Sequence, residues 1–179
     1  EVRDGGGVSP DIEVKQERLP NILFYLVRDN LIFDYATDYC LKHPAIASAK
    51  EFELTDADYE EFKNKVKGAD FKYDQQSEKI LNTLKEAAEF EGYMKDASDE
   101  FKALENKLKH NLDRDLDYFS KDIKKMIAEE IIKRYYYQEG AIIQQLKDDK
   151  DLDEAVKVLT NPERYQQILS VTAVTAKKE

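Results

Sequence analysis

Apolar residues recur at every third or fourth position along most of this sequence, which is the spacing of one face of an α-helix. The longest such stripes run through residues 101–119 and 123–146. Alternation of apolar and polar residues, which is typical of a half-buried strand, is confined to Asp11–Val14. The pattern predicts an all-α chain that folds as a multi-helix bundle after a short extended segment.

Glycine, proline and capping residues divide the pattern into separate helices. We expect the first helix to run from about Pro20 to about Lys42, because Pro44 disfavours helical backbone at the residue before it. Thr55 and Asp58 predict a capping box that opens a second helix, which ends at Gly68. Further helices are expected over residues 75–92, 98–119, 122–146, 151–159 and 162–171.

The first expected helix has an unusually wide apolar face. Phe24, Val27 and several tyrosines widen its stripe beyond one ordinary core face. Such a helix needs cover on several sides, and apolar surface of this kind normally marks an interface. We therefore predict that Leu23, Leu26 and Phe33 contact another domain or subunit.

The stripe over residues 122–146 contains two unusual features. A glycine inside a helix costs about 1 kcal/mol relative to alanine, so Gly140 either lets two backbones approach closely or marks a break, and we favour the close approach of two backbones. Tyr135–Tyr137 could form a stacking platform for a ligand. Since consecutive helical residues point in different directions, we expect one or two of these rings in the core instead.

The charge balance excludes several classes of partner. The chain has 28 Lys and Arg against 38 Asp and Glu residues, a formal net charge of -10. This field repels phosphate backbones and anionic headgroups, so nucleic acid and membrane surfaces are not expected partners. The longest apolar run, Ile22–Val27, falls far short of the roughly 20 residues that a membrane-spanning helix needs.

Side chains that could carry out catalysis or bind a metal are sparse. His43 and His110 are the only histidines and Cys40 is the only cysteine. A zinc site and a His-assisted nucleophile are therefore not expected, and the sequence contains no Ser-x-x-Lys motif. We predict no catalytic residue and no cofactor for this chain.

Two runs of alternating aspartates resemble the opening of an EF-hand calcium loop. They are Asp113, Asp115 and Asp117, and Asp149, Asp151 and Asp153. Neither run has the glycine at position six or the glutamate at position twelve that the loop requires. We interpret the first run as a solvated helix face and the second as a helix start, where carboxylates are favoured by the helix dipole. No metal site is predicted.

The first twelve residues, Glu1–Ile12, resemble the segment that closes the protease domain of carboxyl-terminal processing peptidases, also called tail-specific proteases. In that family a glycine-rich turn and a Pro-Asp pair precede an apolar strand. The matching residues here are Gly5, Gly6, Gly7, Pro10 and Asp11. Residues 126–137 resemble the helical tails of such proteases in Bacteroidetes-like sequences.

The resemblance implies a parent peptidase with a Ser nucleophile, a Lys base, a PDZ-type module that holds substrate C-termini, and export to the periplasm or cell envelope. The family's catalytic residues lie upstream of the matched motif, so none is expected here. The chain is then a remnant of a β-containing protease domain (1–17), a helical C-terminal domain (18–171) and a tail (172–179).

The helical part is expected to serve oligomerisation, substrate access or partner contact, with the parent protease domain as its first partner. A free-standing helical adaptor without protease ancestry is the alternative. A Ser and a Lys encoded shortly upstream would support the peptidase, and a start codon near Glu1 would support the adaptor.

Overall fold

The computed structural model describes residues 10–15 and 18–170 of the chain. These residues form α-helices and two short 3₁₀ turns, with no strand among them. The prediction of an all-α fold is confirmed. Asp11–Val14, which alternates like a strand in the sequence, forms neither helix nor strand. Gly5–Gly7 lie outside the described residues.

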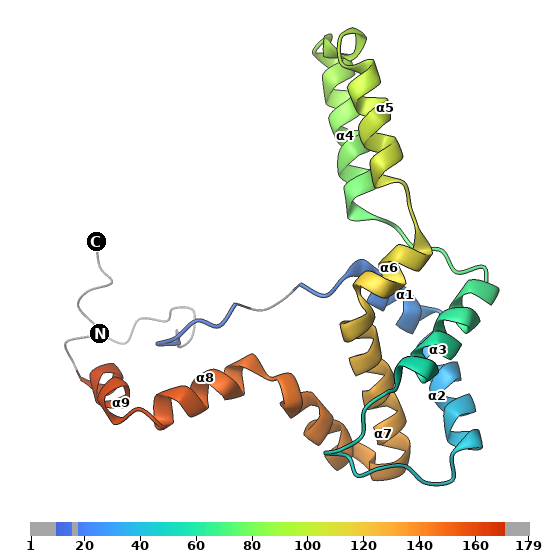
Figure 1. The fold of residues 1–179 in the computed structure, drawn as a ribbon. Coiled ribbons are helices and arrows are strands. Elements are labelled where there is room, and N and C mark those ends of the chain that lie inside the picture. Colours follow the sequence, from blue (N-terminus) through green and yellow to red (C-terminus); the bar gives the residue numbers. More distant parts are fainter. Residues whose placement is uncertain (1–9, 16–17, 171–179) are drawn as a thin grey trace, which may run out of the picture. The chain divides into compact units, whose positions relative to one another are not determined.

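The described residues group into two compact units, one of them Leu19–Gln144 and the other formed by the residues before and after it. In chain order the elements are α1 (Asn21–Arg28), α2 (Leu31–Lys42), α3 (Asp56–Gly68), α4 (Gln76–Phe90), η1 (Tyr93–Lys95), α5 (Ser98–Leu108), α6 (Leu112–Tyr118), α7 (Ser120–Gln145), η2 (Leu146–Asp148), α8 (Lys150–Leu159) and α9 (Pro162–Leu169) (Figure 1). The predicted boundaries at 17–18 and 171–172 stay predictions, because residues 17 and 171 are not described.

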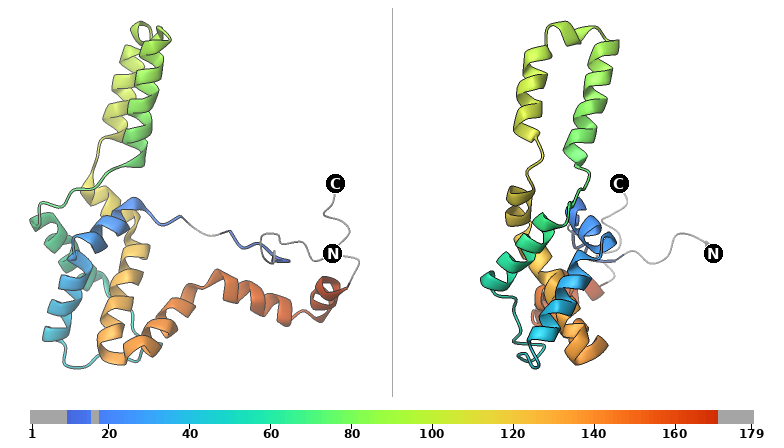
Figure 2. Two further views of the ribbon diagram at one scale, coloured as in Figure 1. Left: turned by 180° about the vertical axis from the view of Figure 1, so that it is seen from behind. Right: turned by 90° about the vertical axis from the view of Figure 1, so that its right-hand side faces the viewer.

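The larger unit is built around one apolar core, to which α1, α2, α3, α6 and α7 contribute (Figures 1 and 2). Its most deeply buried side chains include Ile22, Phe62, Leu116 and Ile127. Burying one such side chain stabilises a fold by about 2 kcal/mol. Several of these helices are so short that they would be marginal in water on their own, and the packing of their apolar faces in this core stabilises them.

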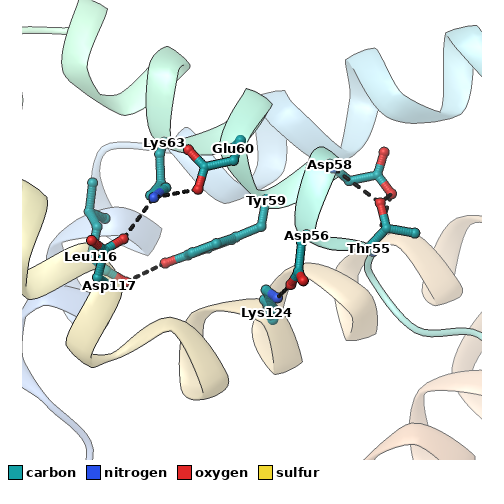
Figure 3. Close-up of polar contacts among 9 residues, drawn as sticks. All are labelled: Thr55, Asp56, Asp58, Tyr59, Glu60, Lys63, Leu116, Asp117 and Lys124. Carbon is teal, nitrogen blue, oxygen red and sulfur yellow. Dashed lines mark hydrogen bonds and ion pairs between the residues drawn. The ribbon is translucent and has the colours of Figure 1, made fainter.

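Helix α3 is fixed to α6 and α7 by polar contacts at the edge of this core (Figure 3). The predicted capping box is confirmed, because the Thr55 hydroxyl accepts a hydrogen bond from the Asp58 amide at 3.1 Å. The Lys63 ammonium lies 2.7 Å from an Asp117 carboxylate oxygen on α6. Lys124 of α7 reaches Asp56 at 2.5 Å, so both neighbouring helices are tied to α3.

The expected first helix is broken in the middle. Asn30 adopts a left-handed conformation, with φ at 58°, and separates α1 from α2. Asn tolerates this region better than most residues because its short polar side chain interacts with the nearby backbone. Pro20 is not the first helical residue as expected, since its ψ of 144° places it just before α1.

The expected helix over residues 98–119 is also divided. Helix α5 ends at Leu108, and Asn111 begins α6 by accepting a hydrogen bond from the Arg114 amide at 3.0 Å. Helices α4 and α5 lie side by side as a hairpin, as the views in Figure 2 show. Leu104 and Leu108 therefore belong to the hairpin, whereas Leu116 belongs to the main core.

The long helix α7 contains a kink at Tyr137 and a close contact at Gly140. Tyr137 has φ of 54° and ψ of −150°, so the helix is kinked there. This break lies three residues before Gly140, and the nearest atoms to Gly140 belong to side chains of the same helix, since a Cβ there would lie 2.4 Å from the Tyr136 Cβ and 2.7 Å from Ile132 Cγ2. The favoured approach of two backbones stays a prediction. The kink turns the chain back onto its own preceding turn, where only glycine fits.

The smaller unit contains α8 and α9, each opened by a side-chain cap. Asp149 accepts a hydrogen bond from the Leu152 amide at 2.9 Å. Asn161 caps α9 in the same way and Pro162 takes its first position, as the sequence predicts. Glu154 of α8 pairs with Arg164 of α9 at 2.6 Å.

Candidate protein-interaction surface

The turn between α1 and α2 directs apolar side chains to the surface. The Asn30 amide donates to the Val27 carbonyl at 3.0 Å, and the Asp34 amide donates to the Asn30 carbonyl at 2.8 Å. The turn is thus closed by backbone hydrogen bonds on both sides of Asn30. It leaves Val27 and Phe33 about half exposed, while Ile32 points into the core.

A groove of about 290 Å³ lies where this turn faces α7. Its lining combines an apolar part with a charged part, and consists of Val27, Asn30, Ile32, Phe33, Met126, Glu129, Glu130 and Lys133. We call this set the α1–α2 groove. Its size suits a single apolar side chain from a polypeptide, flanked by groups that can accept or donate hydrogen bonds.

Arg134 holds one wall of the α1–α2 groove in place. Its guanidinium carbon lies 4.7 Å from the centre of the Phe33 ring, a cation–π arrangement. It also donates to the Phe33 carbonyl at 3.1 Å and to the Glu130 carboxylate at 2.7 Å. Lys133 pairs with Glu129 at 3.1 Å, so the charged edge of the groove is largely neutralised internally. Apolar contact is therefore what the groove offers to a partner.

A family model described as "Probable PDZ-protease, C-terminal helical domain" matches residues 22–159, which include every residue of the groove. The chain belongs to this family. No curated protein and no solved structure matches it. The resemblance to a processing peptidase is thus confirmed at the level of the PDZ-protease helical domain.

This PDZ-protease helical domain places the three predicted interface residues in different surroundings. Leu23 and Leu26 are 2% and 0% exposed and pack inside the domain's own core. Phe33 is 55% exposed and lines the α1–α2 groove. The surface beside Phe33 comes from Val27, together with Met126 of α7, which the sequence analysis did not select. Only the three-dimensional packing decides which part of a wide apolar helix stays outside.

Pro10 and Asp11, the described residues of the family motif, lie in the smaller unit of the chain. They line a second groove, of about 490 Å³, together with residues of α8 and α9. Gly5, Gly6 and Gly7 lie outside the described residues, so the structural role of the glycine turn stays a prediction.

The hairpin α4–α5 is part of the larger unit and is attached to the rest of it through a buried carboxylate. Asp115 of α6 accepts hydrogen bonds from the Tyr73 hydroxyl at 2.5 Å and from the side-chain amide of Gln75 at 2.8 Å. Burial, assisted by the Asp115 carboxylate, raises the pKa of the Tyr73 phenol above its ordinary value. The contact joins the segment before α4 to the helix that follows α5.

Three further members of the two aspartate runs have structural contacts. Asp113 pairs with Lys67, and Asp117 pairs with Lys63. Asp149 is the cap of α8. Within residues 10–15 and 18–170, no three His, Cys, Asp or Glu side chains gather closely enough to hold a metal ion.

The two histidines and the cysteine do not form a common site. His43 stacks on the Tyr39 ring at 4.0 Å, whereas the His110 ring meets the Tyr73 ring edge to face at 4.5 Å. Cys40 is half-buried. The two histidines thus pack against different parts of the domain.

Tyr135–Tyr137 do not share one face, as the helical geometry predicts. Tyr135 packs against the main core and donates a hydrogen bond to the His43 carbonyl. Tyr136 donates to the Ala47 carbonyl at 3.1 Å, while Tyr137 is largely exposed at the kink.

None of the described helices combines the length and apolar character that crossing a bilayer requires.

Proposed function

We propose that this helical domain is the non-catalytic, protein-contacting part of a serine peptidase that cleaves proteins at or near their C-termini. In this proposal the α1–α2 groove binds an apolar side chain of the polypeptide substrate and so assists its access to the protease domain. The observation that carries the proposal is the groove itself, which keeps Val27 and Phe33 exposed beside the core of a PDZ-protease helical domain.

The expected strength of the contact suits a substrate that must be released. Full burial of one apolar side chain contributes about 2 kcal/mol, and the charged edge adds little because its groups already pair with each other. A contact of this size changes the affinity of an extended polypeptide by at most about thirtyfold. The proposal further includes a PDZ-type module and a catalytic Ser and Lys upstream in the parent, and export of the parent to the periplasm or cell envelope.

The proposal is tested in the full-length parent with Phe33→Asp. We expect kcat/KM for an unfolded protein substrate to fall about tenfold, which corresponds to about 1.4 kcal/mol. Cleavage of a peptide too short to reach the groove should be unchanged. Leu41→Asp is the matched control, since Leu41 is an exposed apolar residue of the same helix outside the groove.

Two results would contradict this proposal. One is an equal loss of activity toward the protein and the short peptide, and the other is an equal effect of Leu41→Asp. A third case is that the groove serves self-association. Sedimentation of both variants tests this case, because a dimer that only Phe33→Asp dissociates would assign the groove to contact between two copies. The family match favours the peptidase over the free-standing adaptor, and an upstream Ser and Lys in the parent would support it further.

A further inference from the structure

Helices α8 and α9 have an apolar side that their own unit leaves open. They contain 10 and 8 residues, lengths at which an isolated helix is marginal in water. Neither helix has a buried residue. Several of their apolar side chains are exposed, among them Leu152, Val156 and Leu159. Stable helices of this kind need an apolar surface to cover them.

One edge of this open side is already occupied by the segment before the helical domain. Ile12 and Val14 are half-buried and line the groove of about 490 Å³, opposite Ala155, Val158 and Ile168. Glu13 and Lys15 line a neighbouring groove with charged residues of α8. Ile12 and Val14 line this neighbouring groove too, so the segment lies along α8 with both its apolar and its charged residues.

The same segment leads toward the protease part of the parent. The family model describes a C-terminal domain and begins at residue 22, so the protease part precedes that residue in a member of the family. Residues 10–15 therefore lie on the protease side of the helical domain, either in the connection or in the end of the protease part. A helix pair that packs on these residues lies next to the protease part.

We propose that α8 and α9 dock on the protease domain of their own polypeptide, through the apolar side that Ile12 and Val14 begin to cover. The docked surface continues from this segment across Val158, Leu159 and Ile168. The helical domain is then anchored to the protease at both ends, and α8–α9 act as a strap. This inference rests on the peptidase parent of the proposed function, but not on the α1–α2 groove.

Hydrogen exchange of α8 and α9 in the full-length parent tests the strap. We expect their amides to exchange at least tenfold more slowly in the parent than in the isolated chain. Leu159→Asp should abolish this protection. Leu169→Asp should preserve it, because Leu169 is a leucine of similar exposure, 62% against 68%, that does not line the groove.

Equal exchange in the parent and the isolated chain would overturn the inference. So would protection of the isolated chain that increases with its concentration, because a second copy would then be the occupant. Failure of the strap is distinguishable from failure of the proposed function, since the exchange rates of α8–α9 do not depend on Phe33 or on cleavage of any substrate.

Discussion

The Tyr59 hydroxyl donates a hydrogen bond of 2.6 Å to the backbone oxygen of Leu116 and joins α3 to α6 inside the core. Tyr59→Phe keeps the ring but leaves a buried carbonyl without this donor. We expect the free energy of unfolding to fall by about 1–2 kcal/mol, measured by urea denaturation. Tyr118→Phe, at an exposed residue of α6, is the control and should change it by less than about 0.5 kcal/mol. Equal values for the two variants would contradict the role of this bond.

The helix ends that the sequence predicted correctly are those that depend on neighbouring residues. Thr55 with Asp58, and Asn161 with Pro162, satisfy the backbone groups of their own first turns. Gly92 follows the end of α4 in a left-handed conformation, with φ of 85°. Glycine adopts this conformation without strain because it has no Cβ. In each case the residues that determine the structure lie within one turn of it.

The breaks inside helices could not be predicted from spacing. Leu108 and Leu112 are four residues apart, as in one continuous helix, although α5 ends at the first and α6 starts at the second. The break before α2 had a weak signal in Asn30, which accepts a left-handed conformation more readily than its apolar neighbours. The division of the first helix's apolar face between core and groove depends on α7, which lies about a hundred residues further along the chain.

Gly140 should not accept any side chain. In Gly140→Ala the new Cβ would lie 2.4 Å from the Cβ of Tyr136, an atom that cannot move without the backbone. We expect a loss of about 1–3 kcal/mol in the free energy of unfolding. Gly68→Ala is the matched control, because a Cβ at Gly68 meets no atom within 4 Å. That control should be neutral or stabilising by up to about 1 kcal/mol.

Tyr137 should be replaceable by glycine with a gain in stability. Its φ of 54° and ψ of −150° belong to a region that glycine populates and other residues avoid. The side chain is 78% exposed, so its loss removes little packing. We expect Tyr137→Gly to stabilise the domain by about 1 kcal/mol, because the relief of strain exceeds the added flexibility of the unfolded chain. A lower melting temperature would show that this kink is not strained.

Asp115 should control the attachment of the α4–α5 hairpin. Asp115→Ala removes the acceptor shared by Tyr73 and Gln75, and a buried hydrogen bond to a charged group is worth about 1.5–3 kcal/mol. We expect faster hydrogen exchange in residues 73–75 and a lower free energy of unfolding. Asp113→Ala, at an exposed carboxylate in the same helical turn, controls for the helix dipole. Identical exchange in both variants would contradict the attachment.

The domain should lose stability in alkaline solution because its core tyrosines resist ionisation. Burial raises the pKa of the Tyr35 phenol above its unfolded value of 10.0, and the hydroxyl donates to the Asp58 carbonyl at 2.7 Å. A raised folded pKa gives stability that is complete below pH 10 and is lost as the pH rises toward the folded pKa. The loss is at most about 1.4 kcal/mol per pH unit for each such group.

In urea denaturation between pH 9 and 11, Tyr35→Phe should therefore lose stability less steeply than the unaltered chain, whereas Tyr118→Phe should follow it. An unchanged slope in Tyr35→Phe would show that Tyr35 ionises equally in the folded and unfolded states.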